Sequence, residues 1–156
     1  MTKFASSLFN AGFASGAIYY KDHYYGETQQ TRIVLNVAPE IRSDNTTEMI
    51  VDCAAPWCLL NPELHETWGL DLETDYEPLH AVWIRGTRWL GQLTRTNVAL
   101  QADHGKSLIV TATFFVPTIP SLEIWNYPNF LGLDGFLNRI RYAVDPSENV
   151  FYFGPL

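Results

Sequence analysis

Hydrophobic and polar residues alternate along much of the chain, with the period of two that is typical of strands with one buried face. Residues 32–37 place Ile33, Leu35 and Val37 on one side, and an apolar run at residues 48–51 follows a polar loop. Further strand patterns cover residues 79–84, 89–100, 107–116, 129–131, 142–144 and 150–153. The pattern therefore predicts a mostly β protein.

Turn-forming residues separate several of these segments. Residues 85–88 (RGTR), 103–106 (DHGK) and 145–149 (DPSEN) contain the Gly, Pro, Asp, Asn or Ser that tight turns favour. The first would join two strands into a long hairpin, and the last would join the two final strands. Many short strands connected in this way favour a barrel or a sandwich.

Two segments have the features of short helices. Asn61 can cap a helix that begins at Pro62, and Gly69 can end it. Residues 135–141 carry apolar side chains at helical spacing. One or two short helices are therefore expected beside the strands.

Composition and charge narrow the class of protein. The chain has 156 residues, 47% of them hydrophobic, which suits one domain with a substantial core. A formal net charge of −7 argues against binding to nucleic acid or to an anionic membrane surface, because both need clustered Lys and Arg. No apolar run approaches the roughly 18 residues needed to cross a bilayer.

Residues 1–31 are interpreted as an N-terminal leader, either flexible or contributing an added strand. The apolar patch in this leader is interrupted by Ser6, Ser7 and Asn10, so a secretory signal is not expected. Cys53 and Cys58 lie too close in sequence to link distant parts of the chain through a disulfide. A reduced, cytoplasmic location is therefore expected.

Candidate chemistry starts at Asp52, which directly follows the apolar run 48–51 and precedes three small residues, Cys53, Ala54 and Ala55. Small side chains allow a tight turn, and a carboxylate at the end of a buried strand is costly unless it is hydrogen-bonded. Asp52 could also simply cap a turn. The cysteines and histidines of the chain match no common zinc-ligand spacing, so no metal is expected.

Three segments together carry a resemblance to a known family. Residues 50–55 (IVDCAA) place two apolar residues before an aspartate and small residues, and residues 130–132 (FLG) form a second apolar run that ends in glycine. Between them lies a hairpin at residues 83–90, with Gly86 at its tip. This arrangement resembles the retropepsin-like aspartic proteases, the single-domain type that is similar to half of a pepsin-like enzyme. The resemblance implies an all-β, closed or partly open acid-protease β-barrel over residues 32–156.

The resemblance also implies a role for each segment. Asp52 would be the catalytic residue of an active loop that includes Cys53, Ala54 and Ala55. Phe130, Leu131 and Gly132 would pass behind that loop and support it, whereas Ile84, Arg85, Gly86 and Thr87 would form a substrate-covering flap. No cofactor is implied.

A homodimer follows from this resemblance, because one chain supplies one aspartate and the family needs two across a twofold axis. Two adjacent carboxyl groups share one proton, since they cannot both ionise comfortably. The charged member would take a proton from water while the protonated member polarises the peptide carbonyl. The implied partners are a second copy of the chain and an extended peptide or protein substrate.

Two positions depart from the family pattern. Cys53 stands where the family has Thr or Ser, whose hydroxyl locks the two active loops together, and a thiol is a weaker hydrogen-bonding group. Ala54 stands where the family has Gly, so a methyl group restricts the loop backbone. An aspartic endopeptidase is expected, with a non-catalytic peptide-binding or structural dimer as the alternative. The tail hairpin at residues 142–153 is the expected part of the dimer contact.

Overall fold

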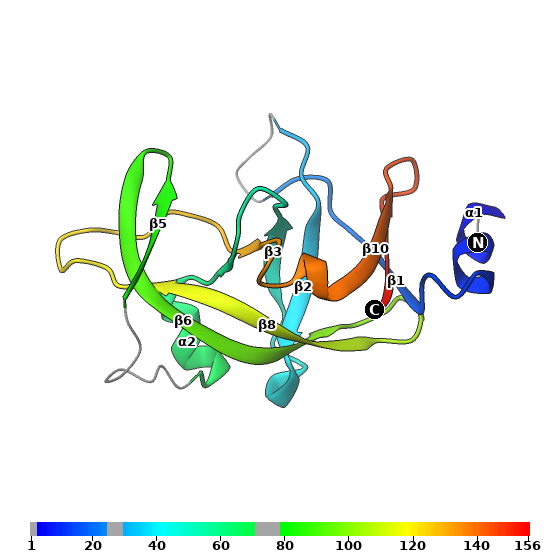
Figure 1. The fold of residues 1–156 in the computed structure, drawn as a ribbon, viewed down its shortest axis with the longest axis horizontal. Helices are drawn as coiled ribbons and strands as arrows, with labels where there is room; N and C mark the ends of the chain where they lie inside the picture. Colours follow the sequence, from blue (N-terminus) through cyan, green and yellow to red (C-terminus); the bar gives the residue numbers. More distant parts are fainter. Residues whose placement is uncertain (1–2, 25–29, 71–78) are drawn as a thin grey trace.

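The protein is mostly β, as the alternating pattern predicts (Figure 1). The structure is a computed structural model that describes residues 3–24, 30–70 and 79–156, with side chains from residue 6 onward. Its helices and strands are, in chain order, α1 (Lys3–Asn10), β1 (Gly16–Tyr19), β2 (Val34–Pro39), η1 (Glu40–Arg42), β3 (Thr47–Val51), β4 (Cys58–Leu59), α2 (Pro62–Trp68), β5 (His80–Ile84), β6 (Thr87–Leu100), β7 (His104–Gly105), β8 (Leu108–Pro117), β9 (Phe130–Leu131), η2 (Leu137–Arg139), β10 (Ile140–Asp145) and β11 (Val150–Pro155).

The larger sheet contains seven strands in the order β2-β3-β9-β4-β8-β6-β5. Its longest element is the antiparallel pair of β6 and β8, whose register runs from Gly91 opposite Pro117 to Leu100 opposite Leu108. The sheet folds back on itself, because β2 pairs with β6 as well as with β3. Figure 1 shows β5 and the start of β6 projecting at one end of the molecule.

The smaller sheet contains four strands in the order β10-β11-β1-β7. Strand β1 comes from the N-terminal segment and pairs with β11, with Gly16 opposite Phe153. Gly16 allows this close approach, because a Cβ there would lie 2.5 Å from the Phe153 ring. The leader of residues 1–31 therefore contributes a strand at 16–19, whereas residues 1–2 and 25–29 lie outside the described part.

Residues 103–106 lie in the connection that reverses the chain between β6 and β8, as the turn-like sequence predicts. Two of them, His104 and Gly105, also pair as β7 with Ala17 and Gly16 at the edge of the smaller sheet. The Asp103 carboxylate accepts a hydrogen bond of 2.8 Å from the backbone of Tyr19. A segment more than 80 residues away in sequence therefore holds this turn against the smaller sheet.

One predicted helix is confirmed and the other is wrong. The Asn61 side chain accepts a bond of 2.9 Å from the Glu63 amide at the start of α2, and Gly69 ends the helix with a φ of 66°. Residues 135–141 form only the short turn η2, because Ile140 already pairs with Pro155 as the first residue of β10. Strand pairing takes over before a full helix can form.

The two sheets share one hydrophobic core. Phe151 and Phe153 of the smaller sheet pack with Leu35 and Met49 of the larger one, and all four are fully buried. On the other face of the smaller sheet, residues at the end of α1 and just after it pack against β1 and β11. Phe9 is one of them, and the centre of its ring lies 6.3 Å from that of Tyr152. Burial of this aromatic surface supplies much of the stability.

The tail hairpin belongs to this intramolecular sheet, which limits its expected part in a dimer contact. Strand β11 lies between β10 and β1, so its two edges are both bonded within its own chain. In the part of the chain that the structure describes, β10 pairs with β11 alone. If the hairpin joins a second copy by strand pairing, it must therefore use the outer edge of β10.

Candidate active site

Asp52 lies at the first position after β3, where a neighbouring parallel strand holds the backbone. Strands β3 and β9 pair with Ile50 opposite Phe130 and Val51 opposite Leu131. The Asp52 amide continues this ladder by donating to the Leu131 carbonyl at 3.0 Å. The two apolar runs found in the sequence are therefore adjacent in space, and β9 supports the loop that Asp52 begins.

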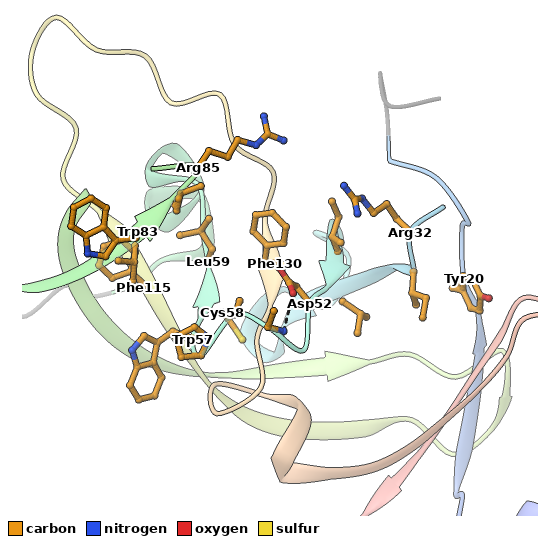
Figure 2. A pocket seen from close by; sticks show the side chains of 18 of the residues that line it. Tyr20, Arg32, Asp52, Trp57, Cys58, Leu59, Trp83, Arg85, Phe115 and Phe130 are labelled. Carbon is orange, nitrogen blue, oxygen red and sulfur yellow. Dashed lines mark hydrogen bonds between the residues drawn. The ribbon is translucent and has the colours of Figure 1, made fainter. Parts of the chain in front are cut away.

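The Asp52 side chain also shapes its own loop. Its Oδ1 atom accepts a hydrogen bond of 2.9 Å from the Ala54 amide, while its carbonyl accepts one of 3.2 Å from Ala55. This is the turn-capping role that the sequence left open. It uses one carboxylate oxygen, and the half-exposed side chain still lines the cleft described below (Figure 2).

Gly132 allows the backbone after β9 to cross directly behind the loop. A Cβ on Gly132 would collide with the carbonyl oxygen of Trp57 and would lie 2.8 Å from that of Ala55. The next residue, Leu133, donates its amide to the same Ala55 carbonyl at 2.7 Å. Glycine is required here because there is no space for a Cβ. Main-chain hydrogen bonding joins the segment after β9 to the loop that Asp52 begins.

Cys53, next to Asp52, is exposed, and it contacts Tyr142, which no local sequence pattern links to the loop. Its Sγ atom lies 3.5 Å from the hydroxyl of Tyr142 in β10, 89 residues further along the chain. The Tyr142 ring stacks on Phe151 at 5.6 Å, with an angle of 10° between the rings. The hydrogen bond to Cys53, followed by burial, raises the pKa of Tyr142 above its ordinary value.

Ala54 fits the loop without backbone strain. Among the described residues other than glycine, only Arg85 and Asn149 adopt a positive φ, so Ala54 does not occupy the left-handed region. The backbone conformation of Ala54 is therefore one that a residue with a Cβ adopts readily. This substitution therefore leaves the turn at Asp52 intact.

The β5–β6 hairpin has a tighter turn than residues 85–88 suggested. Ile84 pairs with Thr87, so only Arg85 and Gly86 form the turn, and their φ angles are 49° and 81°. Two consecutive positive φ angles are the mark of a type I′ turn. Of the four expected flap residues, Ile84 and Arg85 line the cleft, whereas Gly86 and Thr87 are exposed and do not.

Asp52 lies in a cleft of about 750 Å³ between the active loop, the hairpin and the start of β2. Figure 2 shows Asp52 beside Phe130, with Arg85, Arg32 and Tyr20 around the opening. The cleft is lined by Tyr20, Thr31, Arg32, Ile33, Ile50, Val51, Asp52, Ala54, Ala55, Pro56, Trp57, Cys58, Leu59, Val82, Trp83, Ile84, Arg85, Phe115, Phe130, Val144 and Pro146. Of the residues expected to support the loop, Phe130 reaches the cleft, while Leu131 is fully buried in the core.

Several of these lining residues could not be found from sequence. Tyr20 comes from the N-terminal segment, Arg32 from the approach to β2, and Phe115 from the far end of β8. Nothing in the local sequence pattern distinguishes the buried Tyr20 and Phe115 from ordinary core residues. Trp83 also lines the cleft, and only the structure reveals that 70% of it is exposed, although tryptophan is mostly buried.

Among the residues that the structure describes, no three His, Cys, Asp or Glu side chains gather in a way that could hold a metal ion. No helix in the described ranges is both long and apolar enough to cross a membrane.

No protein-family model matches the chain, and no curated protein matches its sequence. Its fold is similar to the crystal structure of a retropepsin-like aspartic protease from Rickettsia conorii, with a TM-score of 0.52 and 16% identity over 88% of this chain and 90% of that one. The chain has the fold of a retropepsin-like aspartic protease. The retroviral protease-like domain of Ddi1 from Leishmania major is also similar, with a TM-score of 0.51 and 17% identity over 81% of this chain and 97% of that one.

Proposed function

We propose that the protein is an aspartic endopeptidase that acts as a homodimer. The observation that carries this proposal is the position of Asp52, at the end of β3, backed by β9 and facing a cleft beneath the β5–β6 hairpin. Retropepsin-like structures with the same fold support the proposal at the level of architecture. In this proposal Asp52 is the catalytic residue and the hairpin is the flap.

A second subunit is needed because the cleft contains half of the required acid–base pair. Among the residues that the structure describes, Asp52 is the only carboxylate that lines it. Activation of water by aspartates needs one group that accepts a proton and another that donates a hydrogen bond to the carbonyl. The partner subunit's Asp52 would supply the second group if two copies pair about a twofold axis.

The proposed reaction is the hydrolysis of a peptide bond. The ionised aspartate removes a proton from water, the resulting oxygen attacks the carbonyl carbon, and the protonated aspartate hydrogen-bonds to the carbonyl oxygen. Collapse of the tetrahedral intermediate breaks the C–N bond, with the nitrogen taking up a proton. Because the pair shares one proton, its titration belongs to both carboxyl groups together.

The substrate would lie extended across the active loop beneath Ile84 and Arg85 of the flap. Phe130, which is half-buried, lines the cleft between the flap and the loop and would contact apolar substrate side chains. Main-chain hydrogen bonds to an extended peptide would add affinity without demanding a particular sequence. Phe130, Leu131 and Gly132 would keep the Asp52 loop in position during the reaction.

The decisive experiment compares Asp52→Asn with the native chain on an unstructured peptide pool analysed by mass spectrometry. Cleavage should fall by at least about a hundredfold, because the variant cannot accept the proton from water. Sedimentation should show the same dimer for both proteins. Asp134→Asn is the matched control, since Asp134 is exposed and does not line the cleft. Equal cleavage by Asp52→Asn and the native protein would refute the proposal.

Cys53 favours a second candidate function, a non-catalytic dimer that binds extended peptides. A thiol in place of the hydroxyl weakens the hydrogen bonding between active loops that the family uses. The double variant Cys53→Thr/Ala54→Gly separates the two functions. Cleavage that appears only in the double variant would support the non-catalytic candidate, whereas turnover by the native chain would exclude it.

A further inference from the structure

The β5–β6 hairpin extends beyond the strand on which the rest of β6 lies. Strand β8 pairs with β6 from Gly91, opposite Pro117, in the direction away from the hairpin turn. Among the described strands of this sheet, β5 is the edge strand, so residues 80–90 project as a two-stranded hairpin (Figure 1). Because a two-stranded hairpin alone is only marginally stable in water, its position over Asp52 depends on the residues that pack against it.

The loop that follows β8, residues 118–128, packs against this hairpin. The ring centre of Trp89 in β6 lies 5.1 Å from that of Trp125 and 5.9 Å from that of Tyr127, and the two loop rings are 4.9 Å apart. All three pairs have the edge-to-face arrangement that aromatic side chains prefer. We call Trp89, Trp125 and Tyr127 the aromatic brace. At the hairpin turn, the guanidinium carbon of Arg85 also lies 5.9 Å from the centre of the Tyr127 ring.

The aromatic brace belongs to the same hydrophobic cluster as side chains of the cleft. That cluster includes Val82, Ile84 and Phe130, which all line the cleft. Trp89 lies directly opposite Val82 in the β5–β6 register, and only 7% of it is exposed. Because main-chain hydrogen bonds join the paired strands, a displacement of Trp89 also displaces the cleft side of the hairpin. The contact of Trp89 with the loop therefore influences the shape of the cleft.

Two polar groups oppose the packing of the aromatic brace. The indole N–H groups of Trp89 and Trp125 are buried, and neither has a hydrogen-bond partner among the residues that the structure describes. A buried donor without an acceptor costs free energy, which is recovered when the donor reaches water. Ring contact therefore favours the packed arrangement, whereas the two N–H groups favour separation of the rings. This opposition makes the packed arrangement one that can be released.

We propose that Trp125 and Tyr127 are positioning residues that hold the β5–β6 hairpin over Asp52 through their contact with Trp89. When the hairpin lifts to admit a peptide, the three rings separate and both indole N–H groups reach water. The three residues are not among those that line the cleft, so they act through the hairpin. The consequence for peptide cleavage rests on the proposed function, whereas the stability of the hairpin can be measured without it.

Hydrogen exchange followed by mass spectrometry tests the aromatic brace in the native chain and in Trp125→Leu. Trp125 is half-buried in a loop without regular secondary structure, so both sheets should stay folded in the variant. Exchange at residues 80–90 should become at least about fivefold faster, because the aromatic contact with Trp89 is lost. Exchange at residues 92–100, where β6 pairs with β8, should not change. Tyr127→Leu should have the same selective effect.

Two further variants are the matched controls. Trp125→Phe keeps an aromatic ring and removes the unpaired N–H, so exchange at residues 80–90 should stay within about twofold of the native rate. Trp68 also has a buried indole N–H without a partner, and it packs edge-to-face on Phe114 in the other hydrophobic cluster, at 5.7 Å between ring centres. Trp68→Phe should lower the thermal midpoint without a selective increase of exchange at residues 80–90.

Peptide kinetics relate the aromatic brace to the proposed function. A fluorescent peptide should dissociate at least about threefold faster from Asp52→Asn/Trp125→Leu than from Asp52→Asn, because the hairpin lifts more readily. In the chain with Asp52 intact, Trp125→Leu should raise KM for a cleaved peptide and leave kcat near the native value. This split is expected because the hairpin contacts the bound peptide both before and during the reaction.

Failure of this proposal and failure of the peptidase can be distinguished. Native exchange at residues 80–90 in Trp125→Leu, or an equal increase along all of β6, would overturn the proposal. Exchange in Trp125→Phe as fast as in Trp125→Leu would also overturn it, because the aromatic contact would then not be the cause. If exchange increases selectively but the native chain cleaves no peptide, the aromatic brace stands and the peptidase fails. Cleavage with unchanged exchange and unchanged KM in Trp125→Leu would give the reverse conclusion.

Discussion

The thiol of Cys53 lies 3.5 Å from the hydroxyl of Tyr142, which links the active loop to strand β10 of the smaller sheet. Cys53 stands where the retropepsin-like pattern has a hydroxyl residue. In this chain the hydroxyl beside Cys53 comes from Tyr142, whose ring is held by stacking on Phe151. The loop next to Asp52 thus has an anchor within its own chain.

Removal of the Tyr142 hydroxyl should loosen this anchor. Tyr142→Phe keeps the stacked ring but loses the hydrogen bond, and a typical bond of this kind contributes about 1 kcal/mol or less. The free energy of unfolding measured with urea should fall by that amount, and peptide cleavage should decrease through kcat more than through KM. Tyr19→Phe, which removes an exposed hydroxyl bonded to His104 outside the cleft, should leave cleavage unchanged. Equal cleavage by native and Tyr142→Phe proteins would contradict the anchoring role.

The two cysteines should differ sharply in reactivity. Cys53 is exposed, whereas Cys58 is fully buried and its burial raises its pKa to about 12. Because the thiolate is the reactive form, a disulfide reagent at pH 8 should modify one thiol in the folded protein and two in urea. Cys53→Ser should remove the fast reaction. Two fast thiols in the folded native protein would contradict the burial of Cys58.

The same buried thiol predicts a loss of stability at alkaline pH. The Cys58 pKa is raised from 9.0 when exposed to about 12 in the folded protein. Its contribution is therefore fully present below pH 9 and is lost as the pH rises towards 12, with a slope of about 1.4 kcal/mol per pH unit. Free energies of unfolding between these pH values should decline less steeply for Cys58→Ala. Parallel curves would show that Cys58 titrates alike in both states.

A methyl group added at Gly132, where space is lacking, should destabilise the fold more than one added at a glycine that only needs a positive φ. Gly132→Ala would place a methyl group against the carbonyl oxygens of Trp57 and Ala55, and we expect a loss of about 3 kcal/mol. Gly12→Ala is the comparison, because Gly12 has a φ of 68° but no atom near its missing Cβ, so about 1 kcal/mol is expected. Urea unfolding of both variants measures the difference. A smaller loss for Gly132→Ala than for Gly12→Ala would argue against the close crossing of the loops.

Truncation after Arg141 should unfold the protein rather than only weaken a dimer. The removed residues include Phe151 and Phe153, which are fully buried in the shared core, and truncating one buried phenylalanine typically costs about 3–5 kcal/mol. Circular dichroism should therefore show loss of the β structure. Deletion of the exposed Leu156 alone should change neither the spectrum nor the thermal midpoint. If the truncated protein stayed folded but became monomeric, the tail would instead act mainly in the contact between subunits.

Local features of the sequence were enough to predict much of the fold. Alternation located the long strands, and Asn61 with Gly69 marked the ends of α2, because capping depends on residues a few positions apart. The two apolar runs around Asp52 and before Gly132 could be proposed as neighbours, and β3 and β9 do pair. These predictions succeeded because short-range geometry dictates them.

The tertiary structure alone decided how distant segments complete the cleft. Residues 135–141 have helical spacing, but the pairing of Ile140 with Pro155 of β11 leaves only the short turn η2. The turn at residues 103–106 was predicted, but its pairing with β1 was not. Likewise, the contact of Cys53 with Tyr142 and the placement of Arg32 opposite Arg85 join residues separated by dozens of positions. The free energy of strand pairing and core burial exceeds weak local preferences, and no local pattern contains that information.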